Sequence, residues 1–197
     1  MENHDNATWL FIRPSVDFHN AELWWTSLFT IFAFSEVQSK GKFSLPAHAV
    51  NEAGELSRAK VIDMSMMTYQ NTVVDGRLRK DVFGLSEWPN QFLDLKPDIT
   101  IIPSKNERTV LFIEVKTVGT SVKRNALLYQ ALRDYMRGLG WSAELIYLMS
   151  KGHEEPSDWA VLRNTDALVF TWEDVFLQAQ GTTFENLLGE PLHSYVR

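Results

Sequence analysis

The sequence predicts an α/β fold with a central mixed β-sheet flanked by helices. Two apolar runs, at residues 99–102 and 110–113, indicate neighbouring strands of a hairpin. A helical segment and another apolar strand follow this hairpin, and such a strand–helix–strand unit forms a right-handed parallel crossover. A long apolar helix is expected before these strands. Antiparallel and parallel pairs would therefore share one sheet, with helices packed against it.

The first expected elements are a short strand and a long helix. Residues 9–13 indicate a strand that Pro14 stops, and Asn20 is a good N-cap for a helix over residues 21–38. Apolar positions make a broad buried face on this helix, so we expect it to be central and packed on more than one side. Thr and Ser residues interrupt it, which makes it too short and polar to span a bilayer comfortably.

The region around residues 40–90 is expected to be an insertion or embellishment within a single domain, 1–197. Residues 60–69 are compatible with a strand or a helix, and Asp75-Gly76 is a plausible hairpin turn between residues 72–74 and a segment starting at Leu78. We expect specificity or dimer contacts in residues 40–96 and in the stretch after Trp172.

The second half of the chain gives clearer signals. Ser121 is the expected cap of a helix that runs to about Arg137 and ends at the glycines of residues 138–140. Residues 143–149 indicate a strand, followed by a loop at 152–157. A further strand is expected at residues 167–171, and a second helix begins at Trp172.

Charged residues gather near one end of the predicted hairpin. Asp98 opens its first strand, and Glu114 and Lys116 lie near the end of its second strand. Because side chains alternate between the faces of a strand, Glu114 and Lys116 point the same way. The turn at residues 104–107 brings Asp98 roughly opposite Glu114. Two carboxylates and an ammonium at the end of an apolar sheet are costly unless they bind something, which predicts a divalent-metal site.

A simpler interpretation is an exposed ion pair between Glu114 and Lys116 on an edge strand, with Asp98 only beginning a strand after Pro97. Such a pair is common and stabilises a protein by less than about 1 kcal/mol. The continuous apolar runs argue against it, because they indicate strands that are covered on both faces.

The residues Pro97-Asp98 and Glu114-Val115-Lys116 resemble the motif of the PD-(D/E)xK nuclease superfamily, with 16 residues (114 − 98) from Asp98 to Glu114. This resemblance implies the restriction-endonuclease-like fold with an αβββαβ core, and the expected order of helix, strand region, hairpin, helix and strand matches it. It also implies a Mg²⁺-dependent nuclease in which Mn²⁺ can substitute. DNA is the expected substrate, in restriction, repair, recombination or defence, and cleavage of RNA stays open.

The resemblance assigns roles to the three charged residues. Asp98, Glu114 and the Val115 carbonyl would hold one or two ions, because Mg²⁺ prefers oxygen ligands. Lys116 would orient or deprotonate a metal-bound water and stabilise the charge of the transition state. The products expected from the family carry a 5′-phosphate and a 3′-hydroxyl.

Two further residues are candidates through the same resemblance. The family usually adds an acidic residue from the first helix, for which Glu22 is the first candidate and Glu36 the second. Alternatively, Glu22 only complements the helix dipole. One exonuclease-like branch carries Gln-x-x-x-Tyr on the next helix. Gln130 lies there, but Tyr135 follows it at the fifth position instead of the fourth, and Gln130 is equally compatible with a solvent-facing position.

Composition limits the possible partners. The 197 residues are 45% hydrophobic and contain no Cys, which excludes disulfides and thiolate metal sites. The net charge of −6 argues against broad nonspecific coating of nucleic acid. Basic clusters could still contact phosphate, unless they are ordinary surface charges; these are Arg77, Arg79 and Lys80, and Lys123 and Arg124.

The start of the chain lacks the basic and apolar regions of a signal peptide, so we expect a cytoplasmic protein with no membrane segment. The five His show no close pairing and are expected at the surface. Cleavage of both DNA strands by one small domain implies a homodimer. A second class of function is a binding or inhibitory protein that keeps the nuclease fold without turnover. The intact set of Asp98, Glu114 and Lys116 favours the enzyme.

Overall fold

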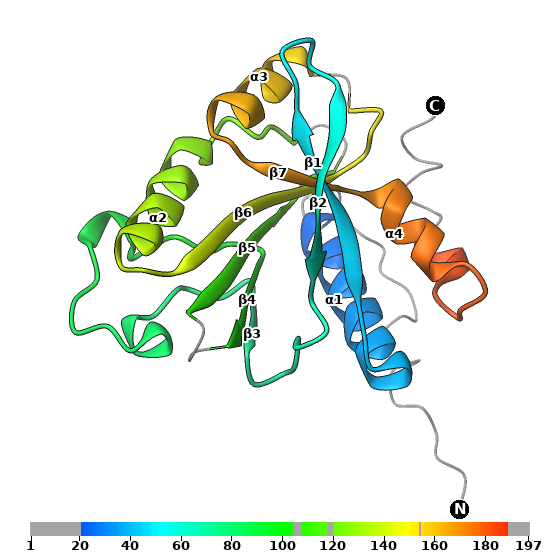
Figure 1. Ribbon diagram of the computed structural model, residues 1–197, viewed down its shortest axis with the longest axis horizontal. Helices are drawn as coiled ribbons and strands as arrows, with labels where there is room; N and C mark the ends of the chain where they lie inside the picture. Colours follow the sequence, from blue (N-terminus) through cyan, green and yellow to red (C-terminus); the bar gives the residue numbers. More distant parts are fainter. Residues whose placement is uncertain (1–20, 105–107, 118–119, 154, 189–197) are drawn as a thin grey trace, which may run out of the picture.

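The computed structural model describes residues 21–104, 108–117, 120–153 and 155–188, and these form a mixed sheet with helices on both of its faces (Figure 1). The predicted α/β class is therefore confirmed. The strands are β1 (Ser44–Val50), β2 (Leu56–Asp63), β3 (Thr72–Val74), β4 (Ile99–Ser104), β5 (Thr109–Val115), β6 (Ser142–Met149) and β7 (Leu168–Thr171). The helices are α1 (Ala21–Lys40), α2 (Ala126–Gly138), α3 (Pro156–Asn164) and α4 (Trp172–Ala179), with short 3₁₀ turns η3 (Lys80–Phe83) and η4 (Asn90–Phe92).

Within the described residues, the sheet has seven strands in the order β2-β1-β7-β6-β5-β4-β3. The strands β5, β6 and β7 are parallel, whereas β4 is antiparallel to β5, β3 to β4, and β1 to both β7 and β2. The predicted hairpin is confirmed, because Ile99 pairs with Ile113 and Ile101 with Leu111. Helix α2 connects the parallel strands β5 and β6, as expected for a crossover.

Two apolar cores lie on opposite faces of the sheet. Helices α1 and α4 cover one face, and α2 and α3 cover the other (Figure 1). Strand β5 serves both cores: Ile113 and Val115 pack on the α1 side, and Val110 and Phe112 pack on the α2 side. Since side chains alternate along a strand, Glu114 shares the α2 face with Phe112.

The long apolar helix α1 is confirmed as a central element. Leu28, Phe29, Phe32 and Ala33 are fully buried on it, and Trp25 packs edge-on against Trp172 of α4. None of the helices in the described residues is long and apolar enough to cross a membrane. The expected strand at 9–13 and the expected cap Asn20 lie outside the described residues.

The predicted hairpin turn at Asp75-Gly76 is wrong. Strand β3 pairs with β4, and the following segment instead donates from the Leu78 N–H to the Leu95 carbonyl. Asp75 adopts a left-handed conformation and donates its N–H to the carbonyl of Asp98. The chain does turn at Asp75, but this local signal could not show that β3 pairs with the distant strand β4 and not with the segment that follows the turn.

The region around residues 40–90 contributes β1, β2 and β3 to the sheet. Of the ambiguous residues 60–69, those up to Asp63 belong to β2, and the rest form turns that bury Met64 and Met67.

Two boundaries in the second half also differ from expectation. Helix α2 begins at Ala126, because the Ser121 hydroxyl donates to Asp158 and does not cap the helix, and residues 122–125 form turns. The expected loop at 152–157 is cut short by α3, which begins at Pro156. Pro at the first helical position is a common start signal that the sequence interpretation overlooked.

Candidate active site

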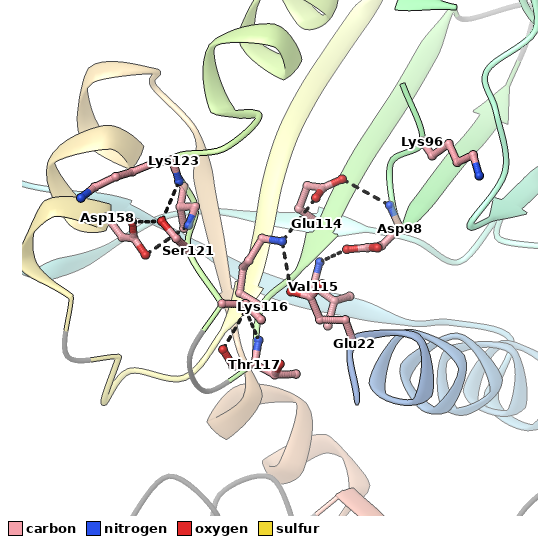
Figure 2. Close-up of polar contacts among 12 residues, drawn as sticks. Glu22, Lys96, Asp98, Glu114, Val115, Lys116, Thr117, Ser121, Lys123 and Asp158 are labelled. Carbon is pink, nitrogen blue, oxygen red and sulfur yellow. Dashed lines mark hydrogen bonds and ion pairs between the residues drawn. The ribbon is translucent and has the colours of Figure 1, made fainter. Parts of the chain in front are cut away.

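The hairpin of β4 and β5 holds the two central carboxylates. Asp98 directly precedes β4, and the pairing of Ile99 with Ile113 places it beside Glu114 (Figure 2). The backbone N–H of Asp98 donates to Glu114 Oε1 at 3.3 Å, and the Val115 N–H donates to Asp98 Oδ2 at 2.7 Å. Backbone groups of the hairpin itself therefore fix both carboxylates.

Lys116 links this pair to helix α1. Its N–H donates to the Leu148 carbonyl of β6 at 2.8 Å, which holds the backbone just beyond β5. Its ammonium lies 3.6 Å from Glu114 Oε2 and 3.2 Å from Glu22 Oε1 in the first turn of α1 (Figure 2). Glu22, Asp98, Glu114 and Lys116 thus come together around one position. Glu36 does not join them, because it pairs with Lys40 at 2.6 Å.

The site concentrates negative charge in a buried place. Glu114 is only 6% exposed, and burial, aided by the charge of Asp98, raises its pKa to about 8. Burial likewise raises the pKa of Asp98 to about 6, against the opposing effects of the Val115 N–H and Lys116. Burial alone would lower the pKa of Lys116, but attraction to Glu114, Glu22 and Asp98 outweighs it and raises that pKa. Such a site favours an additional cation.

We expect the metal-free protein to lose stability as pH rises from about 6 to 8. Because the pKa values of Asp98 and Glu114 are raised above their ordinary values of 3.8 and 4.5, the folded state binds more protons than the unfolded state over this range. The free energy of unfolding then falls as pH rises through the two folded-state pKa values. Thermal midpoints measured in EDTA across this range test the sign. Glu114→Gln serves as the comparison. If the thermal midpoint of the wild type rose with pH relative to that of Glu114→Gln, the prediction would be wrong.

A pocket of about 370 Å³ opens over these residues. Besides Glu22, Asp98, Glu114 and Lys116 it is lined by Lys96, Thr120, Ser121, Val122, Arg124, Asn125, Tyr129 and Tyr147. The ammonium of Lys96 points away from the two carboxylates (Figure 2). The pocket therefore joins an acidic end, on the hairpin and α1, to a polar end formed by the segment that leads into α2.

Two tyrosines in the pocket were missed by sequence reasoning. The Tyr129 hydroxyl donates to the Lys96 carbonyl at 3.0 Å and lies near Glu114. Burial, followed by the charge of Glu114, raises the pKa of Tyr129. Tyr147 lies beside Glu114 in the parallel register of β5 and β6. Both looked like apolar positions, one in a helical stripe and the other in a strand, so no local signal marked them. Gln130, the residue singled out on α2, is half-buried and does not line the pocket.

The two predicted basic clusters lie differently with respect to the pocket. Arg77 pairs with Asp94, Arg79 pairs with Asp81, and Lys80 donates to the Ser86 carbonyl, and none of the three lines the pocket. In the second cluster both residues are exposed; Arg124 lines the pocket and Lys123 does not.

Asp158 anchors the segment that carries Arg124. This fully buried carboxylate accepts hydrogen bonds from the Ser121 hydroxyl at 3.0 Å and the Val122 N–H at 3.1 Å, and it bonds His153 Nε2 at 2.9 Å. Helix α3 therefore fixes the polar rim of the pocket.

The expectation that the histidines lie at the surface is wrong for His48 and His153. His153 is held by Asp158 as above, and His48 bonds Asp174 at 2.8 Å, with the side chains only 7% and 12% exposed. A lone His gives no sequence signal of a carboxylate that is distant along the chain.

The donor set fits a hard divalent cation only in part. The described residues contain no group of three or more His, Asp or Glu side chains placed to hold one ion. Asp98 and Glu114 each use one oxygen for a backbone N–H, which leaves Asp98 Oδ1 without a hydrogen bond in the described residues and Glu114 Oε2 facing Lys116. Two carboxylates together with the Val115 carbonyl suit an ion such as Mg²⁺, which keeps several of its water ligands.

Comparisons with protein-family models, with curated proteins and with solved structures found no match for this chain. Function has to be inferred from the geometry and chemistry of the site. The resemblance to the PD-(D/E)xK nucleases accordingly depends on the residues of the hairpin and on where they lie.

Proposed function

We propose that this protein is a metal-dependent nuclease of the PD-(D/E)xK type that hydrolyses phosphodiester bonds in DNA. The observation that carries the proposal is the convergence of Asp98, Glu114 and Lys116 in one pocket at the end of the β4–β5 hairpin. A further carboxylate, Glu22 from the start of α1, reaches the same ammonium.

The order of elements supports the same proposal. Helix α1, the antiparallel strands β3, β4 and β5, helix α2 and the parallel strand β6 follow one another in the order αβββαβ, with β1 and β2 inserted after α1. We propose that these elements form a restriction-endonuclease-like core.

The proposed roles follow from the chemistry of each side chain. Asp98, Glu114 and the Val115 carbonyl would hold Mg²⁺ or Mn²⁺, since the two carboxylates lie together and carry charge that burial makes costly. When bound, the ion would polarise the scissile phosphate and acidify a water. The Lys116 ammonium, whose pKa its acidic neighbours raise, would stay charged and stabilise negative charge on the phosphate.

We expect cleavage of plasmid, linear duplex or single-stranded DNA to require Mg²⁺ or Mn²⁺ and to stop in EDTA. An Asp98→Asn protein keeps an acceptor for the Val115 N–H but loses a charged ligand, so its rate should fall by at least about 100-fold. Gel assays with RNA in parallel would define the substrate, and simultaneous cleavage of both strands would favour a homodimer. Cleavage that persists in EDTA, or at full rate in Asp98→Asn, would contradict the proposal.

A nuclease fold retained for binding or inhibition is the second candidate. The ion pair between Glu22 and Lys116 favours this candidate. Because Glu22 is held by this pair, only the two carboxylates on the hairpin are left as charged ligands among the residues described at the site. This alternative predicts nucleic-acid or protein binding with no turnover under any metal condition. Calorimetry with Mn²⁺ separates the two, because a binding protein has no need of an ion at Asp98 and Glu114.

A further inference from the structure

The polar end of the pocket carries a cation, Arg124, that has no partner among the residues described by the structure. The Arg124 side chain lines the pocket and forms no hydrogen bond or ion pair within the described residues. This differs from Arg77, Arg79 and Lys80 outside the pocket, which are all satisfied by protein groups. A guanidinium that pairs with none of the described residues is available for an anionic ligand at the pocket, and its planar fork suits phosphate.

Tyr147, which lines the same pocket, has a buried hydroxyl with no hydrogen bond to any described residue. Tyr147 is only 1% exposed, and its hydroxyl has no hydrogen-bond partner in the described part of the protein. The other buried side-chain atoms in this condition belong to Thr26, Trp88, Thr100 and Trp172, none of which lines the pocket. Burying a hydroxyl without a hydrogen bond is unfavourable, so the Tyr147 hydroxyl is placed to donate to a ligand.

Helix α2 contributes further donors at this end. Asn125 occupies its N-cap position, but the Asn125 side chain makes no capping hydrogen bond, and no acidic residue lies in the first turn. The first N–H groups of a helix have no acceptor within the helix, and the helix dipole places partial positive charge there. Helix N-termini of this kind bind phosphate groups.

We propose that Arg124, Tyr147 and the N-terminal end of α2 form a phosphate-binding subsite, which holds a phosphate group of the nucleic acid next to the one that is cleaved. All three supply donors or positive charge. Arg124 and the start of α2 come from the segment that leads into α2, and Tyr147 lies beside Glu114 in the register of β6 against β5. This inference rests on the proposed nuclease function. The phosphate belongs either to an internal linkage or to a strand end, and the two sources share the same chemistry.

The test measures binding without cleavage. Fluorescence anisotropy with Ca²⁺ in place of Mg²⁺ would compare single-stranded oligonucleotides that carry either a 5′-phosphate or a 5′-hydroxyl. Arg124→Ala and Tyr147→Phe should each weaken binding by about tenfold, as expected for loss of a hydrogen bond to a charged group. For Arg124→Ala the slope of log affinity against log salt should also fall by about 0.7.

A matched control removes an exposed arginine elsewhere. Arg58 on β2 is exposed and does not line the pocket, so Arg58→Ala should bind like the wild type. Tyr147→Phe should melt at or above the wild-type temperature, because the hydroxyl that it removes has no hydrogen-bond partner among the described residues. A purely structural role for Tyr147 predicts a lower melting temperature and unchanged binding.

The outcomes separate this subsite from the nuclease itself. Weaker binding only with the 5′-phosphate identifies a strand end, and equal weakening on both oligonucleotides identifies an internal phosphate. If both variants bind more weakly than the wild type but the wild type never cleaves, the nuclease function fails and the subsite stands. If the wild type cleaves and both variants bind as it does, the subsite is overturned and the nuclease stands. A wild type that binds neither oligonucleotide also overturns the subsite.

Discussion

Glu114→Gln is expected to abolish metal-dependent cleavage while leaving the fold intact. Glutamine has the shape of glutamate and still accepts from the Asp98 N–H, but it no longer supplies a charged oxygen to the ion. The loss should be at least about 100-fold in rate, because the removal of a group that stabilises transition-state charge costs about 100- to 1,000-fold. The metal-free variant should also be more stable than the wild type at pH 8, because Glu114 is a buried carboxylate with a raised pKa.

The experiment needs three readouts: cleavage rate, calorimetric Mn²⁺ binding and the thermal midpoint in EDTA. Glu36→Gln is a matched control, since Glu36 is also buried but pairs with Lys40 near the end of α1. It should bind Mn²⁺ and cleave as the wild type does. Wild-type Mn²⁺ affinity together with wild-type cleavage in Glu114→Gln would remove Glu114 from the metal site.

The strand pair of the site was predictable because short-range rules determine it. Alternation of side chains along β5 and a short connection to β4 suffice to bring Asp98 roughly opposite Glu114. These rules do not fix the register to the residue, which the structure gives as Ile99 paired with Ile113. Helix α1 was recognisable from its apolar positions. Which of its acidic residues faces the hairpin depends on how the helix crosses the sheet, so Glu22 and Glu36 could only be ranked.

The other half of the pocket could not be predicted, because it depends on contacts between distant segments. Tyr147 approaches Glu114 only through the register of β6 against β5, and nothing in the apolar run of β6 distinguishes it. Ser121, the expected cap of α2, instead donates its hydroxyl to Asp158. Asp158 belongs to helix α3, which the sequence interpretation did not include. A capping residue indicates a helix start only when no stronger acceptor competes for its hydroxyl.

Lys116→Met is expected to separate catalysis from metal binding. The methionine keeps an unbranched side chain of similar length but removes the ammonium that lies 3.6 Å from Glu114 Oε2 and 3.2 Å from Glu22 Oε1. Without it, Asp98 and Glu114 attract any cation more strongly, and a divalent ion gains more from this than a proton does. Mn²⁺ binding should therefore be retained or tightened, while cleavage falls by at least about 100-fold because charge on the phosphate is no longer stabilised.

This result would differ in direction from that of Glu114→Gln, in which binding and cleavage are lost together. Lys40→Met is the matched control, because Lys40 also pairs with a glutamate of α1 but lies outside the pocket. Lys116→Met that cleaves at the wild-type rate would contradict the proposed mechanism. Loss of Mn²⁺ binding along with cleavage would instead mean that Lys116 acts by holding Glu114 in place, since an ammonium that only competes with the ion cannot be required for the ion to bind.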